Sequence, residues 1–102
     1  MSDIANTPPP PYYAVIFTSI RTEGDNGYAE TAENILALAR QQPGFLGYES
    51  VRNGVGISVS YWSSLEAIRN WRDNPEHKKV QARADDWYVD SRIRICKVER
   101  SY

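Results

Sequence analysis

The sequence has one cysteine and one histidine among its 102 residues, and it has no long hydrophobic run. The single cysteine, Cys96, cannot form an internal disulfide, so we expect a cytoplasmic protein in a reducing environment. No apolar segment approaches the ~20 residues that a membrane-spanning helix needs, and residues 1–11 lack the basic and apolar regions of a secretory signal. The sequence therefore predicts no membrane partner.

Neither basic nor acidic residues are in large excess. The formal net charge is −1, whereas proteins that bind nucleic acids or anionic membranes normally carry a basic surplus. The sequence has no phosphate-binding loop, GxGxxG motif, CxxC pair or HExxH motif, so nucleotide and zinc chemistry have no support. One histidine, His77, cannot by itself supply the three or four protein ligands of a zinc site. We predict no metal, no cofactor and no nucleic-acid partner.

Four consecutive prolines, Pro8 to Pro11, set the N-terminal segment apart from the rest of the chain. Proline cannot donate a backbone hydrogen bond and favours the extended polyproline II conformation. We therefore predict that residues 1–11 form a flexible or semi-rigid leader. The alternative is a ligand for a proline-binding domain, because any run of four prolines supplies a PxxP spacing. Residues 12–102 have the length of one domain.

The rest of the chain alternates between strand and helix patterns. We predict a first helix at residues 28–41, a second helical region between residues 63 and 88, and strands at residues 12–20, 45–52, 55–62 and 91–100. The order β-α-β-β-α-β is that of the ferredoxin-like fold, an α+β class with an antiparallel four-stranded sheet.

Short local signals predict where these elements begin and end. The Asn-Gly pair at residues 53–54 predicts a type I′ hairpin turn, in which both central residues take positive φ. Ser63, with Glu66 three residues later, has the spacing of a capping box and predicts a helix N-terminus. The Asn-Pro pair at residues 74–75 predicts the cap and first position of a further helical segment.

The side chains best suited to a site are concentrated between residues 55 and 88, which hold all three tryptophans and the only histidine. Strand alternation places Trp62 on the same face as Ser60, and such a small neighbour leaves space in front of the indole. Ordinary core packing is the alternative for this indole. Trp71 and Trp87 occupy helical positions, and we expect them to pack in the core or at an interface.

Two other side chains have alternative interpretations. His77 lies near a helix N-terminus, where the helix dipole disfavours the protonated ring. It is either a partly exposed surface residue or a neutral imidazole that faces a pocket and acts as a base. Cys96 lies on a predicted strand among apolar neighbours, so we expect a buried, inert thiol rather than a reactive one.

Several segments resemble the antibiotic biosynthesis monooxygenase family. They are PGFLGYES at residues 43–50, SVSYW at residues 58–62, LEAIRNWRDNPEHKKVQ at residues 65–81, and the closing WY at residues 87–88. The resemblance implies a homodimer, the dimeric α+β barrel, in which two ferredoxin-like sheets face each other. It also implies a pocket between sheet and helices. The family includes cofactor-free oxygenases of quinols and polycyclic aromatics, and haem-degrading enzymes.

The resemblance carries over to this chain residue by residue. The strand tryptophan that lines the pocket of the haem-degrading members is matched by Trp62. Gln81 stands where those enzymes have the histidine that ligates the haem iron, and Thr18 or Ser19 stands where they have an asparagine. Two of the three signature residues are therefore missing. The resemblance disfavours haem degradation unless His77, one turn away, replaces the ligand.

The sequence thus predicts a cofactor-independent, monooxygenase-like enzyme that acts on a small aromatic or quinol substrate. In this hypothesis His77 is the catalytic base and Trp62 is the pocket wall, and the polar partners of the substrate are Ser60, Thr18, Gln81 and Arg92. One alternative is a non-catalytic, dimeric protein that binds small molecules, and a second is a haem-binding or haem-degrading protein. RNA recognition motifs share the element order, but the basic sequence that they need is absent.

Overall fold

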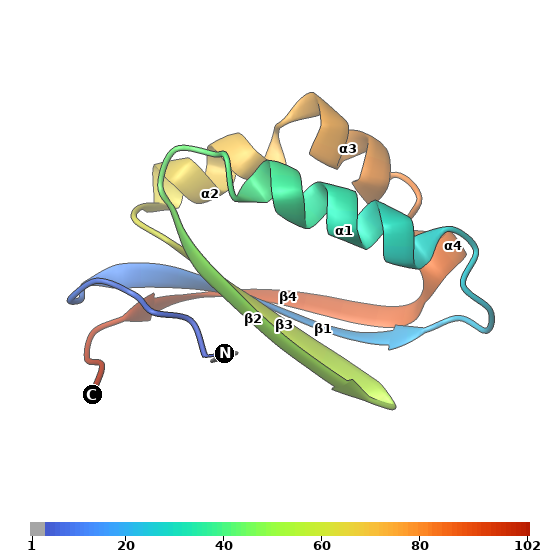
Figure 1. The fold of residues 1–102 in the computed structure, drawn as a ribbon, viewed down its shortest axis with the longest axis horizontal. Coiled ribbons are helices and arrows are strands. Elements are labelled where there is room, and N and C mark those ends of the chain that lie inside the picture. Colours follow the sequence, from blue (N-terminus) through green and yellow to red (C-terminus); the bar gives the residue numbers. More distant parts are fainter. Residues whose placement is uncertain (1–3) are drawn as a thin grey trace.

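A computed structural model describes residues 4–102. Four strands form one antiparallel sheet in the order β2-β3-β1-β4, and the helices cover one face of it (Figure 1). The elements are β1 (Tyr12–Arg21), α1 (Tyr28–Ala39), β2 (Phe45–Asn53), β3 (Val55–Trp62), α2 (Leu65–Arg72), α3 (Pro75–Gln81), α4 (Ala84–Trp87) and β4 (Tyr88–Val98). The predicted ferredoxin-like α+β fold is confirmed, with α2 to α4 together in the place of its second helix. Within residues 4–102, no helix is long and apolar enough to cross a membrane.

The hairpin between β2 and β3 lies where it was predicted, but it is not a type I′ turn. Asn53 pairs with Val55 across the turn, and Gly54 alone between them takes a positive φ, of 78°. The strands therefore continue to within one residue of each other, and the position that requires glycine is Gly54.

The caps of the helical region differ from the prediction in one place. The N-cap of α2 is Ser64, whose hydroxyl accepts a hydrogen bond from the Ala67 backbone at 3.0 Å, and not Ser63. Ser63 instead donates its backbone N–H to the carbonyl of Gly44 at 2.8 Å, which holds it beside the loop before β2 and moves the cap by one residue. The cap of α3 is Asn74 with proline at the first helical position, as predicted.

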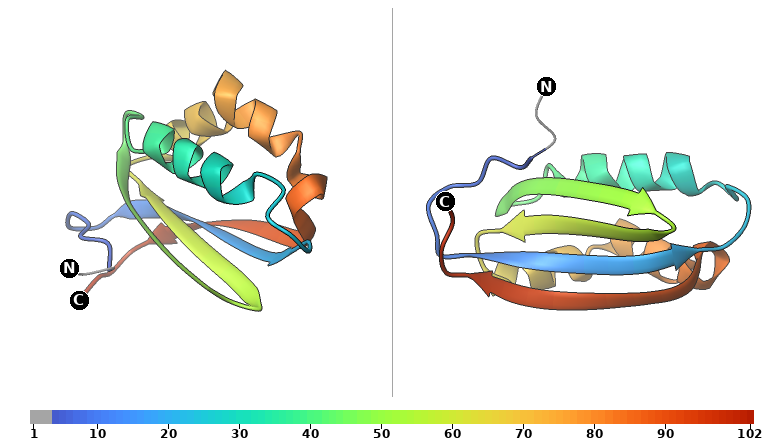
Figure 2. Two further views of the ribbon diagram at one scale, coloured as in Figure 1. Left: turned by 45° about the vertical axis from the view of Figure 1, so that its right-hand side comes forward. Right: turned by 90° about the horizontal axis from the view of Figure 1, so that it is seen from below.

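Strand alternation divides the sheet into an inner face, toward the helices, and an outer face. Trp62, Ser60 and Ser58 of β3 lie on the inner face, opposite alternate residues of β1. Ile57 and Tyr61 lie on the outer face, which no helix crosses when the molecule is seen from below (Figure 2, right).

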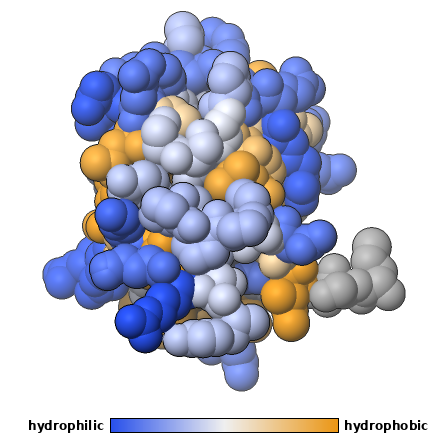
Figure 3. Space-filling view, turned by 90° about the vertical axis from the view of Figure 1, so that its left-hand side faces the viewer, coloured by the Kyte–Doolittle hydropathy of each residue, from blue (hydrophilic) through white to orange (hydrophobic). Residues whose placement is uncertain are grey.

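Trp87 of α4 is buried separately, and the main hydrophobic core cluster lies at one end of the space between helices and sheet. Its buried members are Ala39, Trp62, Ala67, Ile68 and Trp71. The corresponding end of the molecular surface, on the left of Figure 1, shows small apolar areas surrounded by polar side chains (Figure 3). This end of the domain is therefore closed by large side chains from α1, α2 and β3.

The segment before β1 contacts the outer face of the sheet. The backbone N–H of Ala5 donates to the Glu49 carboxylate at 2.9 Å, and the Tyr61 hydroxyl donates to the other carboxylate oxygen at 2.5 Å. These two bonds, that of Tyr61 first, lower the pKa of Glu49. Residues 4–11 are thus held against β2 and β3 at this end, and residues 1–3 lie outside the described part of the chain.

Cys96 is exposed, so the prediction of a buried thiol was wrong. Cys96 lies on the edge strand β4 and pairs with Ala14 on the outer face. Because no helix of residues 4–102 covers this face, an apolar stretch of sequence on β4 does not become buried there.

Candidate functional site

A cavity of about 700 Å³ lies between the inner face of the sheet and the helices. This volume is in the range of small-molecule pockets, roughly 300–1,000 Å³. Its walls come from every strand and from all four helices. The predicted pocket between sheet and helices is therefore present in the single chain.

Small side chains on the floor of the sheet account for much of this space. Ser58 and Ser60 of β3, Ser50 of β2 and Gly56 all line the cavity. Interiors of proteins are normally filled to crystal-like density by side chains that interdigitate. Where the floor carries hydroxymethyl groups in place of large apolar groups, the helices above it leave a void.

Three aromatic rings stack in series at the closed end of the cavity. The ring centroids of Trp62 and Trp71 are 6.2 Å apart with planes 24° from parallel, and those of Trp71 and His77 are 4.2 Å apart at 14°. All three residues line the cavity. Trp71 was expected only to pack. It belongs to the core cluster and also stacks on His77 in the cavity wall.

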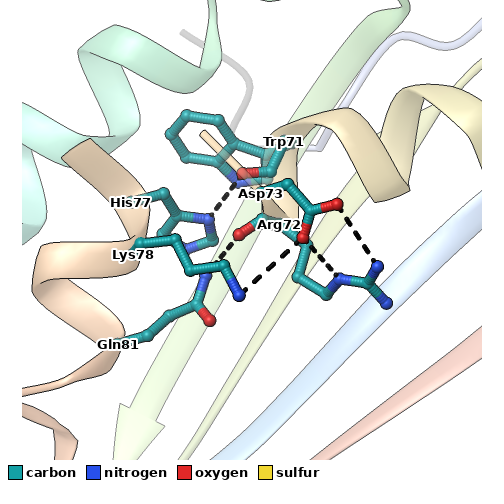
Figure 4. A network of polar contacts seen from close by, with 6 residues as sticks. All are labelled: Trp71, Arg72, Asp73, His77, Lys78 and Gln81. Atoms are coloured by element: carbon teal, nitrogen blue, oxygen red, sulfur yellow. Dashed lines mark hydrogen bonds and ion pairs between the residues drawn. The ribbon is translucent and has the colours of Figure 1, made fainter. Parts of the chain in front are cut away.

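His77 is held by both its backbone and its ring. Asn74 caps α3 and accepts from the His77 backbone N–H at 3.4 Å, and the ring Nδ1 lies 3.1 Å from the carbonyl oxygen of Trp71 (Figure 4). A carbonyl can only accept, so Nδ1 carries the proton in this hydrogen bond. The neutral ring then keeps its lone pair on Nε2.

The electrostatics of the site favour this neutral ring. Burial lowers the pKa of His77 below its ordinary value of 6.5, the hydrogen bond to Trp71 partly opposes this, and the charge of Lys78 lowers it slightly more. A neutral imidazole with one free nitrogen can accept a proton from a ligand. The structure thus provides the chemical form of His77 that a base requires.

Gln81 and Arg72 line the cavity but are engaged in the junction between α2 and α3. The Gln81 side-chain amide donates to the Arg72 carbonyl at 2.9 Å, and the Arg72 guanidinium pairs with Asp73 at 3.1 Å (Figure 4). Lys78 lies 3.8 Å from the same carboxylate. Exposed pairs of this kind contribute little stability, about 0–1 kcal/mol each.

Ser60 and Trp62 lie together in the cavity wall, as the strand pattern predicted. The Trp62 indole N–H donates to the Ser60 hydroxyl at 2.9 Å, and the Trp62 side chain is fully buried. Trp62 is therefore both a core residue and a wall of the cavity. The Ser60 hydroxyl keeps its own proton for another partner.

Thr18 and Arg92 do not line the cavity. They pair with each other across β1 and β4 on the outer face, so the sheet separates them from the other candidates. The neighbouring Ser19, the other possible match for the family asparagine, does line the cavity. Strand alternation, applied with Trp62 as the reference, distinguishes the two residues.

Arg52 also lines the cavity, although it is not among the site residues predicted from the sequence. Its face depends on a bulge near the start of β2, where the pairing with β3 changes register between Phe45 and Gly47. This bulge places Arg52 opposite Gly56 on the inner face. A one-residue register shift changes the face of every later residue in the strand. The sequence has no turn signal that predicts this bulge.

Within residues 4–102, no group of three or more His, Cys, Asp and Glu residues is arranged to hold a metal ion. The Nε2 atom of His77 is the remaining imidazole nitrogen in the cavity that could ligate a haem iron. The position that the resemblance assigns to that ligand is Gln81, whose amide donates to a carbonyl.

A sequence profile of the antibiotic biosynthesis monooxygenase family matches residues 11–83. The chain belongs to this family. It is 50% identical to the uncharacterized protein YqjZ of Bacillus subtilis strain 168, over 98% of this chain and 90% of that protein. The resemblance identified from sequence is thus confirmed for most of the domain.

Solved structures of low sequence identity share the fold of this family member. One is SnoaB, a cofactor-independent oxygenase from Streptomyces nogalater, with a TM-score of 0.78 and 11% identity over 90% of this chain and 97% of SnoaB. Another is protein SO0527 from Shewanella oneidensis, with a TM-score of 0.77 and 9% identity over 96% and 98% of the two chains. At such identities the likeness concerns the fold alone.

Proposed function

We propose that the protein is a cofactor-independent oxygenase that acts on a small aromatic or quinol substrate. The observation that carries this proposal is the neutral His77 ring, with Nδ1 bonded to the Trp71 carbonyl and Nε2 left to accept a proton inside an aromatic cavity. Membership of the family and the fold shared with SnoaB support it.

The proposed reaction needs only the substrate, oxygen and a base. Nε2 of His77 removes a proton from the substrate, and the resulting electron-rich anion transfers an electron to O₂. The superoxide and the substrate radical combine, a carbon–oxygen bond forms, and the anion takes up the proton as a hydroperoxide. Loss of water by cleavage of the O–O bond converts a CH₂ group, which a quinol has in its keto tautomer, to a carbonyl, so that R₂CH₂ and O₂ give R₂CO and H₂O. The apolar walls exclude water from the anion.

We also propose that two copies associate through their outer faces, as the dimeric α+β barrel of the resemblance implies. The side chains of Val51, Val55 and Ile57 on this face are 69%, 48% and 43% exposed. A second copy of the chain would cover this apolar surface. An Ile57→Lys variant should then have the mass of one chain in light scattering, while the parent has the mass of two; a monomeric parent would contradict this proposal.

Oxygen uptake in the presence of a hydroquinone tests the reaction. The parent should consume oxygen as the quinol is oxidised, and His77→Gln should lose most of this activity, because glutamine cannot accept the proton. Lys79→Gln is the matched control, since Lys79 lies on the same helix with its side chain 73% exposed. If His77→Gln consumed oxygen as fast as the parent, the assignment of the base would be wrong.

The two alternative functions give different results in the same measurements. Saturable binding of the aromatic without oxygen uptake would identify a binding protein in place of an enzyme. A Soret band on titration with haem, lost in His77→Gln, would identify a haem protein. The predicted cytoplasmic location stays a prediction and is tested by fractionation of the source cells.

A further inference from the structure

The charged side chains that line the cavity are all basic. They are Arg52 and Arg72, and no aspartate or glutamate of residues 4–102 is part of the lining. Arg72 is paired with Asp73 outside, whereas Arg52 has no ion pair with any described residue. Arg52 is an exposed residue, and no carboxylate of the described residues faces it from the cavity lining, so its charge gives this open part of the cavity a positive potential that favours an anionic ligand.

Two hydrogen bonds hold the Arg52 guanidinium at the cavity, although Arg52 as a whole is exposed to solvent. It donates from Nη1 to the backbone carbonyl of Ser19 at 3.1 Å and from Nη2 to the Ser19 hydroxyl at 2.7 Å. Arginine has five N–H donors in a planar fork, so three remain for another partner. Ser19 is buried, and these two bonds therefore orient the guanidinium from beneath.

Gly56 provides the space in which this guanidinium lies. A Cβ atom on Gly56 would overlap with Cζ and Nη2 of Arg52, because the two residues are direct partners across β2 and β3. Gly56 is not among the glycines with positive φ, so its backbone does not itself require glycine. Glycine is needed here because the Arg52 side chain approaches the backbone of this residue closely.

The part of the cavity near Arg52 has a second polar group, and it lies far along the sheet from Trp62. Tyr88 also lines the cavity, and the charge of Arg52 acts on its hydroxyl. Along β3, Gly56 is six residues from Trp62, which corresponds to roughly 20 Å at about 3.3 Å per residue. The cavity is thus long, with the aromatic stack near one end and Arg52 near the other.

We propose that Arg52 is the residue that selects the substrate, and that it binds a carboxylate carried by an aromatic ligand. The guanidinium fork matches the two oxygens of a carboxylate, and the aromatic walls accept the rings. This inference rests on the proposed function and names its substrate class: planar aromatics with one carboxylate, held at the Arg52 end while the other end of the molecule reaches His77.

Calorimetric titration with two matched probes tests the inference. The probes are 2-naphthoate and 2-naphthamide, which share rings and size and differ in charge. The parent should bind 2-naphthoate more tightly, and Arg52→Gln should weaken its binding about 10- to 100-fold while changing the binding of 2-naphthamide by less than about twofold. Arg69→Gln, on the exposed side of α2 and outside the cavity lining, is the matched control and should bind both probes as the parent does.

Gly56→Ala provides a second test that keeps the charge and moves it. The added methyl group displaces the Arg52 guanidinium from its two bonds to Ser19 and leaves the strand backbone unstrained, so the protein should keep its fold and bind 2-naphthoate more weakly. Unchanged 2-naphthoate binding in Arg52→Gln, equal affinities of the two probes for the parent, or no 2-naphthoate binding by the parent would each overturn the inference. Absence of oxygen uptake alongside selective 2-naphthoate binding would overturn only the proposed function.

Discussion

The two ends of the space between helices and sheet are built from the same layers but are filled differently. At the closed end, Trp62 and Trp71 pack with small and aliphatic residues of α1 and α2. At the other end, Ser58 and Gly56 face the helices, and the cavity of about 700 Å³ extends from there to Trp62 and Trp71, which also line it. The size of the side chains that face inward thus separates a packed core cluster from a cavity floor within the same layers, while Tyr28, Trp87 and Tyr88 pack together at the α4 end.

Of the variants that distinguish the two ends, Trp62→Ala should have the largest effect on stability, because it removes the largest fully buried side chain of the closed end. Removal of a fully buried tryptophan typically costs about 3–5 kcal/mol in the free energy of unfolding. Urea denaturation measures this loss. Ile93→Ala is the control, since Ile93 lines the cavity end and is 62% exposed; an equal loss in both variants would contradict the division into two ends.

Ser60→Ala removes a hydroxyl that lies between the core cluster and the rest of the cavity. The buried indole N–H of Trp62 would lose its acceptor, and an unsatisfied buried donor costs about 1–3 kcal/mol. Denaturation of this variant beside Ser58→Ala, on the same face of the same strand, measures the difference. Equal stabilities would show that water replaces the Ser60 hydroxyl.

The pH dependence of stability should identify the contribution of His77. Its pKa in the folded chain lies below the ordinary 6.5, so the unfolded chain binds the proton first as the pH falls. The contribution is therefore complete above pH 6.5 and is lost as the pH drops below it. Unfolding curves at a series of pH values should show this loss in the parent and not in His77→Gln; parallel pH profiles would contradict the buried, neutral ring.

Ser58→Val should have the smallest effect on stability. It tests whether a residue of the cavity floor affects binding without affecting folding. Valine favours strands and fills empty space, so the free energy of unfolding should change by less than about 1 kcal/mol. Binding of 2-naphthoate should nevertheless weaken, because the floor of the cavity rises. A stability loss as large as that of Trp62→Ala would mean that the floor belongs to the core.

The fold was predictable because each element carries a local signal. Strand alternation gave Trp62 and Ser60 a common face, and the Asn-Pro pair at residues 74–75 placed His77 in the first turn of α3. These signals act within a few residues of one another. The family resemblance then supplied the location of the pocket.

The parts of the site that were not predictable depend on contacts between distant segments. The face of Arg52 follows from the bulge at the start of β2, and the fixed orientation of its guanidinium follows from Ser19, 33 residues away. Thr18 was assigned from an alignment that leaves a one-residue ambiguity, which in a strand exchanges one face for the other. Cys96 was expected to be buried because its neighbours in the sequence are apolar, yet in the described part of the chain no helix covers the outer face of this edge strand.

The stacked pair of Trp71 and His77 has a consequence for how the protein can be observed. A protonated imidazole in contact with an indole quenches its fluorescence, whereas a neutral imidazole does so far less. With ring centroids 4.2 Å apart, the emission of Trp71 should report the charge of His77 directly. Tryptophan fluorescence can therefore follow the protonation of the proposed base without any substrate present.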